Sequence, residues 1–236
     1  FRIMGPTGTG KSSFIARLTG DKSIEIGHGV ESATSEIGHY NYFDKSGRSV
    51  TLIDSPGFDD SREGHTDTDI LKKIAGFLEM TFKEDKKLSG IIYLHRITDP
   101  KMGGVSLRNL RMFRKLCGED ALENVVVVTT RWDDVSEKDR ETMEKREDEL
   151  MKTPGKFFEP LIDKGGKFLR HDNTEGSARR IVETFLKKSP VALQIQLEMR
   201  DGKTLEETAA GSELAAELKK LVDKHSKEMK DLKEEM

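Results

Sequence analysis

Hydrophobic and polar positions alternate in a regular order from residue 1 to about residue 188. Continuous apolar runs at 90–95 and 125–128 are typical of strands buried on both faces. Apolar residues three or four positions apart at 66–82 and 107–116 follow a helical period instead. Further strand-like runs lie at 1–4, 39–43, 49–53 and 167–170, and further helix-like runs at 13–18, 136–150 and 178–186. This order predicts an α/β fold with a mostly parallel sheet covered by helices on both faces.

The composition changes after Ser189 and Pro190 to a mixture rich in Glu, Lys, Leu and Ala. We therefore expect a globular domain at 1–188, with its first strand truncated at the N-terminus, and a helical extension at 189–236. In this extension Leu214, Leu218, Leu221 and His225 follow a four-three-four spacing, whereas the continuation through Met229, Leu232 and Met236 slips by one position. A coiled coil and an amphipathic helix packed on the domain both fit this pattern.

Composition narrows the class of protein. The 236 residues include 34% hydrophobic residues, which is enough for one core. A formal net charge of −3 gives no indication that nucleic acid is the main partner. A single cysteine, Cys117, excludes an internal disulfide and a cysteine zinc cluster, which suits a reducing compartment and predicts a cytoplasmic protein. No apolar stretch has the length of a membrane span, and membrane association stays open.

The segment from Gly5 to Ser12 has two glycines separated by four residues and followed by Lys-Ser, which is the pattern of a phosphate-binding loop. Its glycines permit positive φ, so that several backbone N–H groups converge on one anion. Lys11 adds a charge for the β- and γ-phosphates, and Ser12 offers a hydroxyl to Mg²⁺. The candidate nucleotide-binding residues here are Gly5, Thr7, Gly8, Thr9, Gly10, Lys11, Ser12 and Ser13.

A second motif, Asp54-Ser-Pro-Gly57, follows a predicted strand at its carboxyl end, where ligands of open α/β sheets bind. Asp54 is expected to hold Mg²⁺ through a water molecule, and the Gly57 N–H is expected to contact the γ-phosphate. Loss of that phosphate on hydrolysis would release the turn, as in a nucleotide switch. Thr34 is the first choice for a further, mobile Mg²⁺ ligand, with Ser32 and Ser35 as competitors.

The segment 129–133, Thr-Thr-Arg-Trp-Asp, points to the base of the nucleotide. The Asp133 carboxylate would accept from the N1 and N2 donors of guanine, a pair that adenine does not present. Arg131, which follows Thr130, would lay a planar cation along the purine face. Asn173, beyond the last strand, either contacts the edge of the base or caps the following helix, and both readings stay open.

Together these motifs resemble those of the septin-like (paraseptin) branch of GTPases, which includes septins, immunity-associated (AIG1-type) GTPases and chloroplast-import receptor GTPases. Segments 94–99, 109–118 and 208–211 are similar to fungal G-domain proteins of this branch. The resemblance implies a three-layer P-loop GTPase fold, GTP and GDP as ligands, and Mg²⁺ as cofactor. In the immunity-associated relatives an arginine after the fourth strand reaches the partner's nucleotide in a dimer, and Arg96 occupies the matching place here.

No glutamine stands just after Gly57 to orient an attacking water, since residues 58–60 are Phe-Asp-Asp. We therefore expect Arg96, with His95 beside it, to act together with Gly57 in catalysis, the arginine being supplied across a homodimer formed through the nucleotide faces. Alternatively, His95 and Arg96 only end a strand and pair with Asp99. The sequence thus favours an enzyme that hydrolyses GTP to GDP and phosphate; the second interpretation is a nucleotide-gated scaffold with little turnover.

Overall fold

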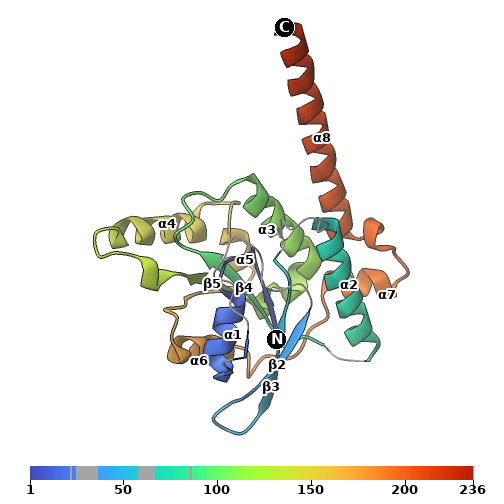
Figure 1. Cartoon of the computed structure of the whole chain (residues 1–236). Helices are drawn as coiled ribbons and strands as arrows, with labels where there is room; N and C mark the ends of the chain where they lie inside the picture. The colour runs from blue at the N-terminus through green and yellow to red at the C-terminus, as the bar shows by residue number, and fades with distance from the viewer. Residues whose placement is uncertain (22, 25–36, 58–66, 85–86, 236) are drawn as a thin grey trace.

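The computed structural model describes residues 1–21, 23–24, 37–57, 67–84 and 87–235, and it contains a six-stranded sheet between two layers of helices (Figure 1). The strands are β1 (Arg2–Met4), β2 (Gly38–Phe43), β3 (Ser49–Asp54), β4 (Ile91–Arg96), β5 (Val125–Thr130) and β6 (Lys167–Arg170). Their order is β2-β3-β1-β4-β5-β6, and only β2 runs antiparallel to its neighbour. The predicted mostly parallel α/β fold is confirmed.

Helices cover both faces of this sheet. One face packs against α1 (Lys11–Thr19) and α6 (Glu175–Glu183). The opposite face packs against α2 (Asp67–Lys83), α3 (Gly104–Cys117), α4 (Arg140–Lys152), α5 (Glu159–Ile162), α7 (Gln194–Arg200) and the start of α8 (Ala209–Glu235). Three short 3₁₀ turns, η1 (Glu119–Asn124), η2 (Trp132–Asp134) and η3 (Leu205–Glu207), complete the described elements.

Alternate residues of the central strands pack against the two helical layers, because successive side chains of a strand point to opposite faces of the sheet. In β5, Val126 and Val128 pack toward α1 and α6, whereas Val125 and Val127 pack toward the other layer, and all four are fully buried. The valine run is therefore buried on both faces, as its sequence predicts.

Four predicted helices begin elsewhere than expected. Helix α1 begins at Lys11 instead of residue 13, and α3 begins at Gly104 instead of residue 107. The helix expected from Ser136 begins at Arg140, because the Ser136 hydroxyl accepts from the Asp139 N–H at 3.3 Å and closes a separate turn first. The helix expected from Ala178 begins at Glu175, where Thr174 caps it by accepting from the Ser177 N–H at 3.2 Å. A side-chain cap therefore sets the start of α6, whereas the N-cap residue of α4, Asp139, makes no side-chain cap hydrogen bond.

The C-terminal extension begins by joining the core and then leaves it. Leu193, Ile195, Ala210 and Leu214 belong to the same buried cluster as α2 and α3, so α7 and the first turns of α8 have no separate core. The rest of α8 projects away from the molecule (Figure 1). Within the part of the chain that the structure describes, no helix, α8 included, is long and apolar enough to cross a membrane. The division at residue 188 stays a prediction.

His95 and Arg96 end β4 with side chains on opposite faces of the sheet. His95 is 2% exposed, and its ring meets the ring of Phe158 edge-on, with centroids 5.5 Å apart. Burial, followed by the neighbouring charges of Arg96 and Arg146, lowers the pKa of His95 to about 4. His95 is therefore a neutral core residue near neutral pH.

The burial of His95 predicts a loss of stability in mild acid. Its folded pKa of about 4 lies below the ordinary 6.5, so the unfolded chain binds more protons between these values and stability falls as the pH drops through this window. This histidine alone should lower the free energy of unfolding by about 2 kcal/mol between about pH 7 and pH 5. Urea unfolding of the parent and of His95→Leu at both pH values measures this contribution, and an equal pH dependence in the two proteins would contradict it.

A pair of helix glycines tests how the extension docks. An alanine Cβ at Gly211 in α8 would lie 2.9 Å from the carbonyl carbon of Leu205, whereas one at Gly76 in α2 would meet nothing within 4 Å. Gly211→Ala should therefore destabilise the protein by about 1–3 kcal/mol because backbone must shift. Gly76→Ala should stabilise it by about 0.5–1 kcal/mol because alanine favours helix. Urea midpoints compare the two, and a stabilising Gly211→Ala would exclude this docking.

Candidate functional site

The carboxyl ends of the five parallel strands lie at one edge of the sheet, and each carries a predicted motif. The phosphate-loop segment follows β1, and Asp54 ends β3, which pairs with β1 on one side. Arg96 ends β4, which pairs with β1 on the other side. The segments 130–133 and 171–173 follow β5 and β6. Parallel pairing therefore brings together residues up to about 170 positions apart along the chain.

The loop after β1 has the backbone that its glycines predict. Gly5, Gly8 and Gly10 have φ of 137°, 74° and 90°. Lys11 is 7% exposed, and its Nζ donates to the carbonyl oxygens of Gly5 and Pro6 at 3.1 and 2.9 Å. The ammonium is thus held over the loop at the start of α1, whose N-terminus carries partial positive charge.

The β3 motif lies directly against this loop. The Ser12 hydroxyl donates to the Asp54 Oδ2 at 3.0 Å, and Asp54 is 1% exposed. A Cβ at Gly57 would lie 2.5 Å from the Thr7 nitrogen, so only glycine permits this approach of the two loops. The structure therefore brings together the predicted direct and water-mediated magnesium ligands.

These groups fit magnesium bound with a nucleotide. A hydroxyl and a carboxylate oxygen are ligand types that Mg²⁺ accepts, usually alongside water and substrate phosphates. Among the described residues no group of three or more His, Cys, Asp or Glu side chains gathers. The remaining ligands would thus come from phosphate, from water or from the predicted Thr34. Thr34, its competitors Ser32 and Ser35, and residues 58–60 lie outside the described residues.

A small pocket separates the loop from the β5 and β6 segments. It has a volume of about 30 Å³ and is lined by Thr9, Gly10, Ser13, Thr130, Arg131, Asp133, His171 and Asn173. The Asn173 Nδ2 donates to the Asp133 Oδ2 at 2.8 Å, and the Arg17 Nε donates to the Asn173 Oδ1 at 3.2 Å. This hydrogen bond therefore holds the Asp133 and Asn173 side chains together at the predicted position of the base, and the pocket between them is small.

Side chains of the segment 131–134, which follows β5, are held by hydrogen bonds and ring contacts to the neighbouring elements. Trp132 is 8% exposed, and its Nε1 donates to the Thr129 hydroxyl at 2.9 Å. The Arg170 guanidinium lies 4.1 Å from the centroid of the Trp132 ring and donates from Nε to the buried Glu147 carboxylate at 2.7 Å. Arg131 has φ of 65° and pairs with Asp134 at 3.5 Å. This network fixes the backbone that presents Asp133.

His171 is a pocket residue to which the sequence alone assigns no role. It is 3% exposed, its Nδ1 lies 2.7 Å from the Ser177 hydroxyl oxygen, and its buried Nε2 has no hydrogen-bond partner. Burial lowers its pKa to about 4, so the imidazole is neutral near neutral pH. The sequence signal that could have identified His171 is its position just after β6, two residues before Asn173. It is a neutral polar group on the wall of this pocket.

Arg96 lies at the rim of the phosphate loop. Its Nη1 would be 3.1 Å from a Cβ at Gly8, and its Nε pairs with the Asp99 carboxylate at 2.9 Å. The side chain is 39% exposed, in contrast to the buried His95 on the opposite face of β4. The expected pairing with Asp99 is present. The catalytic parts of Arg96, His95 and Gly57 stay predictions.

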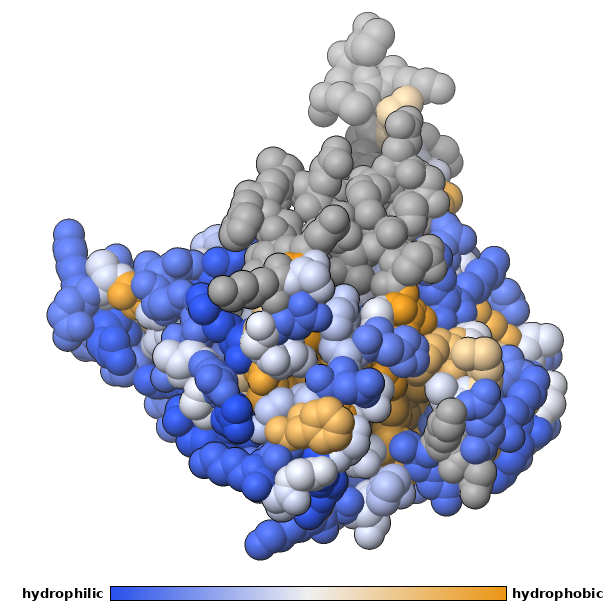
Figure 2. All heavy atoms as spheres, turned by 60° about the horizontal axis from the view of Figure 1, so that its bottom comes forward, coloured by the Kyte–Doolittle hydropathy of each residue, from blue (hydrophilic) through white to orange (hydrophobic). Residues whose placement is uncertain are grey.

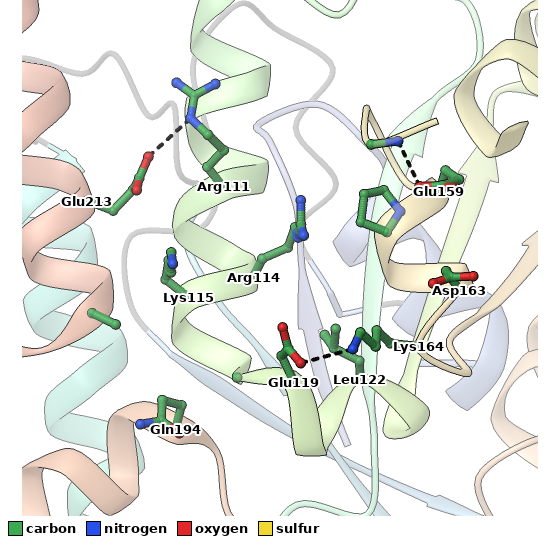
Figure 3. A pocket seen from close by; sticks show the side chains of 14 residues that line it. Arg111, Arg114, Lys115, Glu119, Leu122, Glu159, Asp163, Lys164, Gln194 and Glu213 are labelled. Atoms are coloured by element: carbon green, nitrogen blue, oxygen red, sulfur yellow. Dashed lines mark hydrogen bonds and ion pairs between the residues drawn. The ribbon is translucent and has the colours of Figure 1, made fainter. Parts of the chain in front are cut away.

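Two cavities of about 630 Å³ contain none of these residues. One lies at the opposite edge of the sheet and is lined by apolar residues such as Phe1, Phe77 and Phe185. Figure 2 views the molecule from that side and shows apolar surface within a largely hydrophilic face. The other lies between α3, α5 and the start of α8, with Arg114 and Lys164 on its wall (Figure 3). Neither of these two cavities therefore contains a described residue of the predicted nucleotide site.

Comparison with solved structures gives the same fold. Toc33 from Arabidopsis thaliana in complex with Mg²⁺ and GMPPNP is 19% identical, with a TM-score of 0.59, over 78% of this chain and 81% of that chain. A dimerisation-deficient arginine-to-alanine variant of Toc33 is 17% identical, with a TM-score of 0.59, over 80% and 85%. Era from Aquifex aeolicus, bound to GDP and AlF₄⁻, is 16% identical, with a TM-score of 0.55, over 80% and 56%.

Comparison by sequence gives the family. A search of curated proteins gives no match. A family model described as the AIG1 family matches residues 2–174, a range that contains every described motif residue of this edge from the phosphate loop to Asn173. Septin-like and fungal affinities stay predictions. The chain therefore belongs to the AIG1 family, and with its P-loop fold it is a GTPase of that family.

Proposed function

We propose that this chain binds GTP with Mg²⁺ at the edge of the sheet and hydrolyses it to GDP and phosphate. The observation that carries the proposal is the contact of the Ser12 hydroxyl with Asp54 at 3.0 Å, beside Lys11 on a loop whose backbone can enclose an anion. Mg²⁺, when bound, would neutralise charge on the β- and γ-phosphates. GMPPNP, GDP and Mg²⁺ in the Toc33 structures support this ligand set.

Hydrolysis balances as attack by one water molecule. The water oxygen bonds to the γ-phosphorus, the bond to the β,γ-bridging oxygen breaks, and the water protons pass to phosphate and solvent as GDP leaves. Lys11 and the loop N–H groups would hold the phosphates in line. The Gly57 N–H would contact the γ-phosphate and lose that contact after the reaction, which supplies a switch signal.

Recognition of guanine requires a local rearrangement. In the described state the Asp133 carboxylate accepts from Asn173, so a base must take over that bond before it can pair with Asp133. Guanine offers two donors to this carboxylate, whereas adenine would leave the charge unpaired. Asn173, released from Asp133, would then lie at the edge of the base together with His171.

The proposal includes a homodimer through the nucleotide faces, with Arg96 acting on the partner's nucleotide. The support is the position of Arg96, which is half-exposed at the rim of the phosphate loop and therefore close to any partner that covers the nucleotide. Dimerisation is described as important for the GTPase activity of Toc33, and an arginine-to-alanine change impairs its dimerisation. His95 is buried in the core and would act only through the position of Arg96.

A second candidate function is a nucleotide-gated scaffold with little turnover, in a cytoplasmic or other reducing compartment. The bond between Asp133 and Asn173 favours this reading, because it couples base binding to a change in two loops without any need for chemistry. Turnover per chain measured against protein concentration separates the two functions. Negligible rates at every concentration would favour the scaffold.

Base selection gives a first prediction. Asp133→Asn replaces an acceptor by a group that also donates, which suits the C2 carbonyl of xanthine better than the amino group of guanine. GDP binding should weaken about 100-fold or more, and XDP binding should strengthen. Asp148→Asn makes the same chemical change on α4, at a 57% exposed side chain that pairs with Lys152, and should leave both affinities nearly unchanged. Calorimetric titration of both variants with GDP and XDP tests this; unaltered GDP affinity in Asp133→Asn would refute the base assignment.

Arg96 gives a second prediction. Arg96→Ala should lower GTP turnover at high protein concentration by about 100-fold or more and remove its dependence on concentration. GDP affinity should change little. Arg200→Ala on α7, where the guanidinium faces Phe82 and Asp201, is the matched control and should keep the parent rate. A rate that falls equally at all concentrations would instead assign Arg96 to the nucleotide of its own chain.

A further inference from the structure

Apolar side chains stay exposed on α8 after the helix leaves the core. Leu214 is 3% exposed, but Leu218, Val222 and Met229 are 41%, 63% and 57% exposed. These three side chains are among the few large hydrophobic residues on the described surface. Residues four or eleven positions apart on an α-helix point within about 40° of one another, so the three form one stripe.

The stripe fits one heptad register that has a polar residue at one d position. Ala215, Val222 and Met229 stand at successive a positions, Leu218 stands at the d position between the first two, and the d position before Met229 is His225. In the sequence Leu232 and Met236 continue this spacing by three and four. The slip expected from Leu221 disappears once Val222, its neighbour, is taken as the core position. The exposed stripe thus identifies a register that the sequence left ambiguous.

The attachment of α8 keeps this stripe away from its own domain. Arg111 on α3 pairs with Glu213 at 3.1 Å (Figure 3). It also pairs with Glu217 at 2.9 Å. These ion pairs, with buried Ala210 and Leu214, hold the first turns of α8 along α3. Beyond them the helix extends past the rest of the molecule (Figure 1). The stripe therefore stays accessible on the surface of the described chain.

We propose that the occupant of this stripe is α8 of a second copy of this chain, in a parallel two-stranded coiled coil. A β-branched residue at a with leucine at d, as at Val222 and Leu218, is the composition that favours two parallel strands. In the sequence Glu228 and Lys233 stand five positions apart at g and e, where a parallel pair brings opposite charges together. The pairing goes beyond the proposed function because it needs no nucleotide.

The test is the assembly state of the full chain without nucleotide. Sedimentation velocity should show a species of twice the chain mass of 26.6 kDa, and it should persist in Arg96→Ala, which separates it from a dimer through the nucleotide faces. Val222→Asp should raise the dissociation constant at least about tenfold because it buries a charge in the helix interface. Ala216→Asp, at an exposed position beside the stripe, is the matched control and should keep the dimer.

Orientation is tested with one added thiol. In a parallel pair Met229→Cys places two thiols together, so a short bis-maleimide should link two chains, while buried Cys117 should not react. A parent chain that is monomeric throughout, or equal effects of Val222→Asp and Ala216→Asp, would overturn the pairing. A dimer that the reagent does not link would overturn the parallel arrangement. Unchanged GDP binding in all variants shows that the domain is folded.

Discussion

The parallel pairing of β1 with β3 and β4 is the constraint on which the site depends. It aligns three carboxyl ends, so the phosphate loop lies between Asp54 on one side and Arg96 on the other. The contact between Ser12 and Asp54 follows from that alignment and from the close approach of Gly57 to Thr7. Because strand alternation buries both faces of the central strands, this edge is where their polar residues can meet a ligand.

Charge in this site is arranged before any ligand arrives. Lys11 is buried against carbonyl oxygens of its own loop, and Asp54 is buried beside Ser12, so neither group has to be ordered when phosphate binds. The predicted base pocket differs, since Asp133 and Asn173 are hydrogen-bonded to each other and the pocket volume is only about 30 Å³. In the proposed function the phosphate half would thus be pre-organised, and the base half would exchange one hydrogen bond for another, which would link nucleotide binding to the position of two loops.

The extension is part of the same architecture up to a definite point. Ala210 and Leu214 complete the helical layer over α3, and the ion pairs of Arg111 extend this attachment by one turn. Beyond that turn Leu218, Val222 and Met229 are 41%, 63% and 57% exposed. The first turns of α8 therefore belong to the buried core of the GTPase domain, whereas the later turns of the same helix carry an exposed apolar stripe.

The sequence by itself determined the ligand class and the layering, because glycine spacing, a Lys-Ser pair and apolar periods act locally. Strands β5 and β6 could be predicted nearly to the residue, whereas the starts of α4 and α6 could not, since the turn closed by Ser136 and the cap at Thr174 depend on side-chain geometry. Only the tertiary structure decided which distant groups touch. The Asn173 contact with Asp133, the burial of His95 and the pocket position of His171 depend on strand order and on which face a residue occupies. The register of α8 likewise required the structure, because the 63% exposure of Val222 on a helix that is fixed to α3 cannot be read from the sequence pattern.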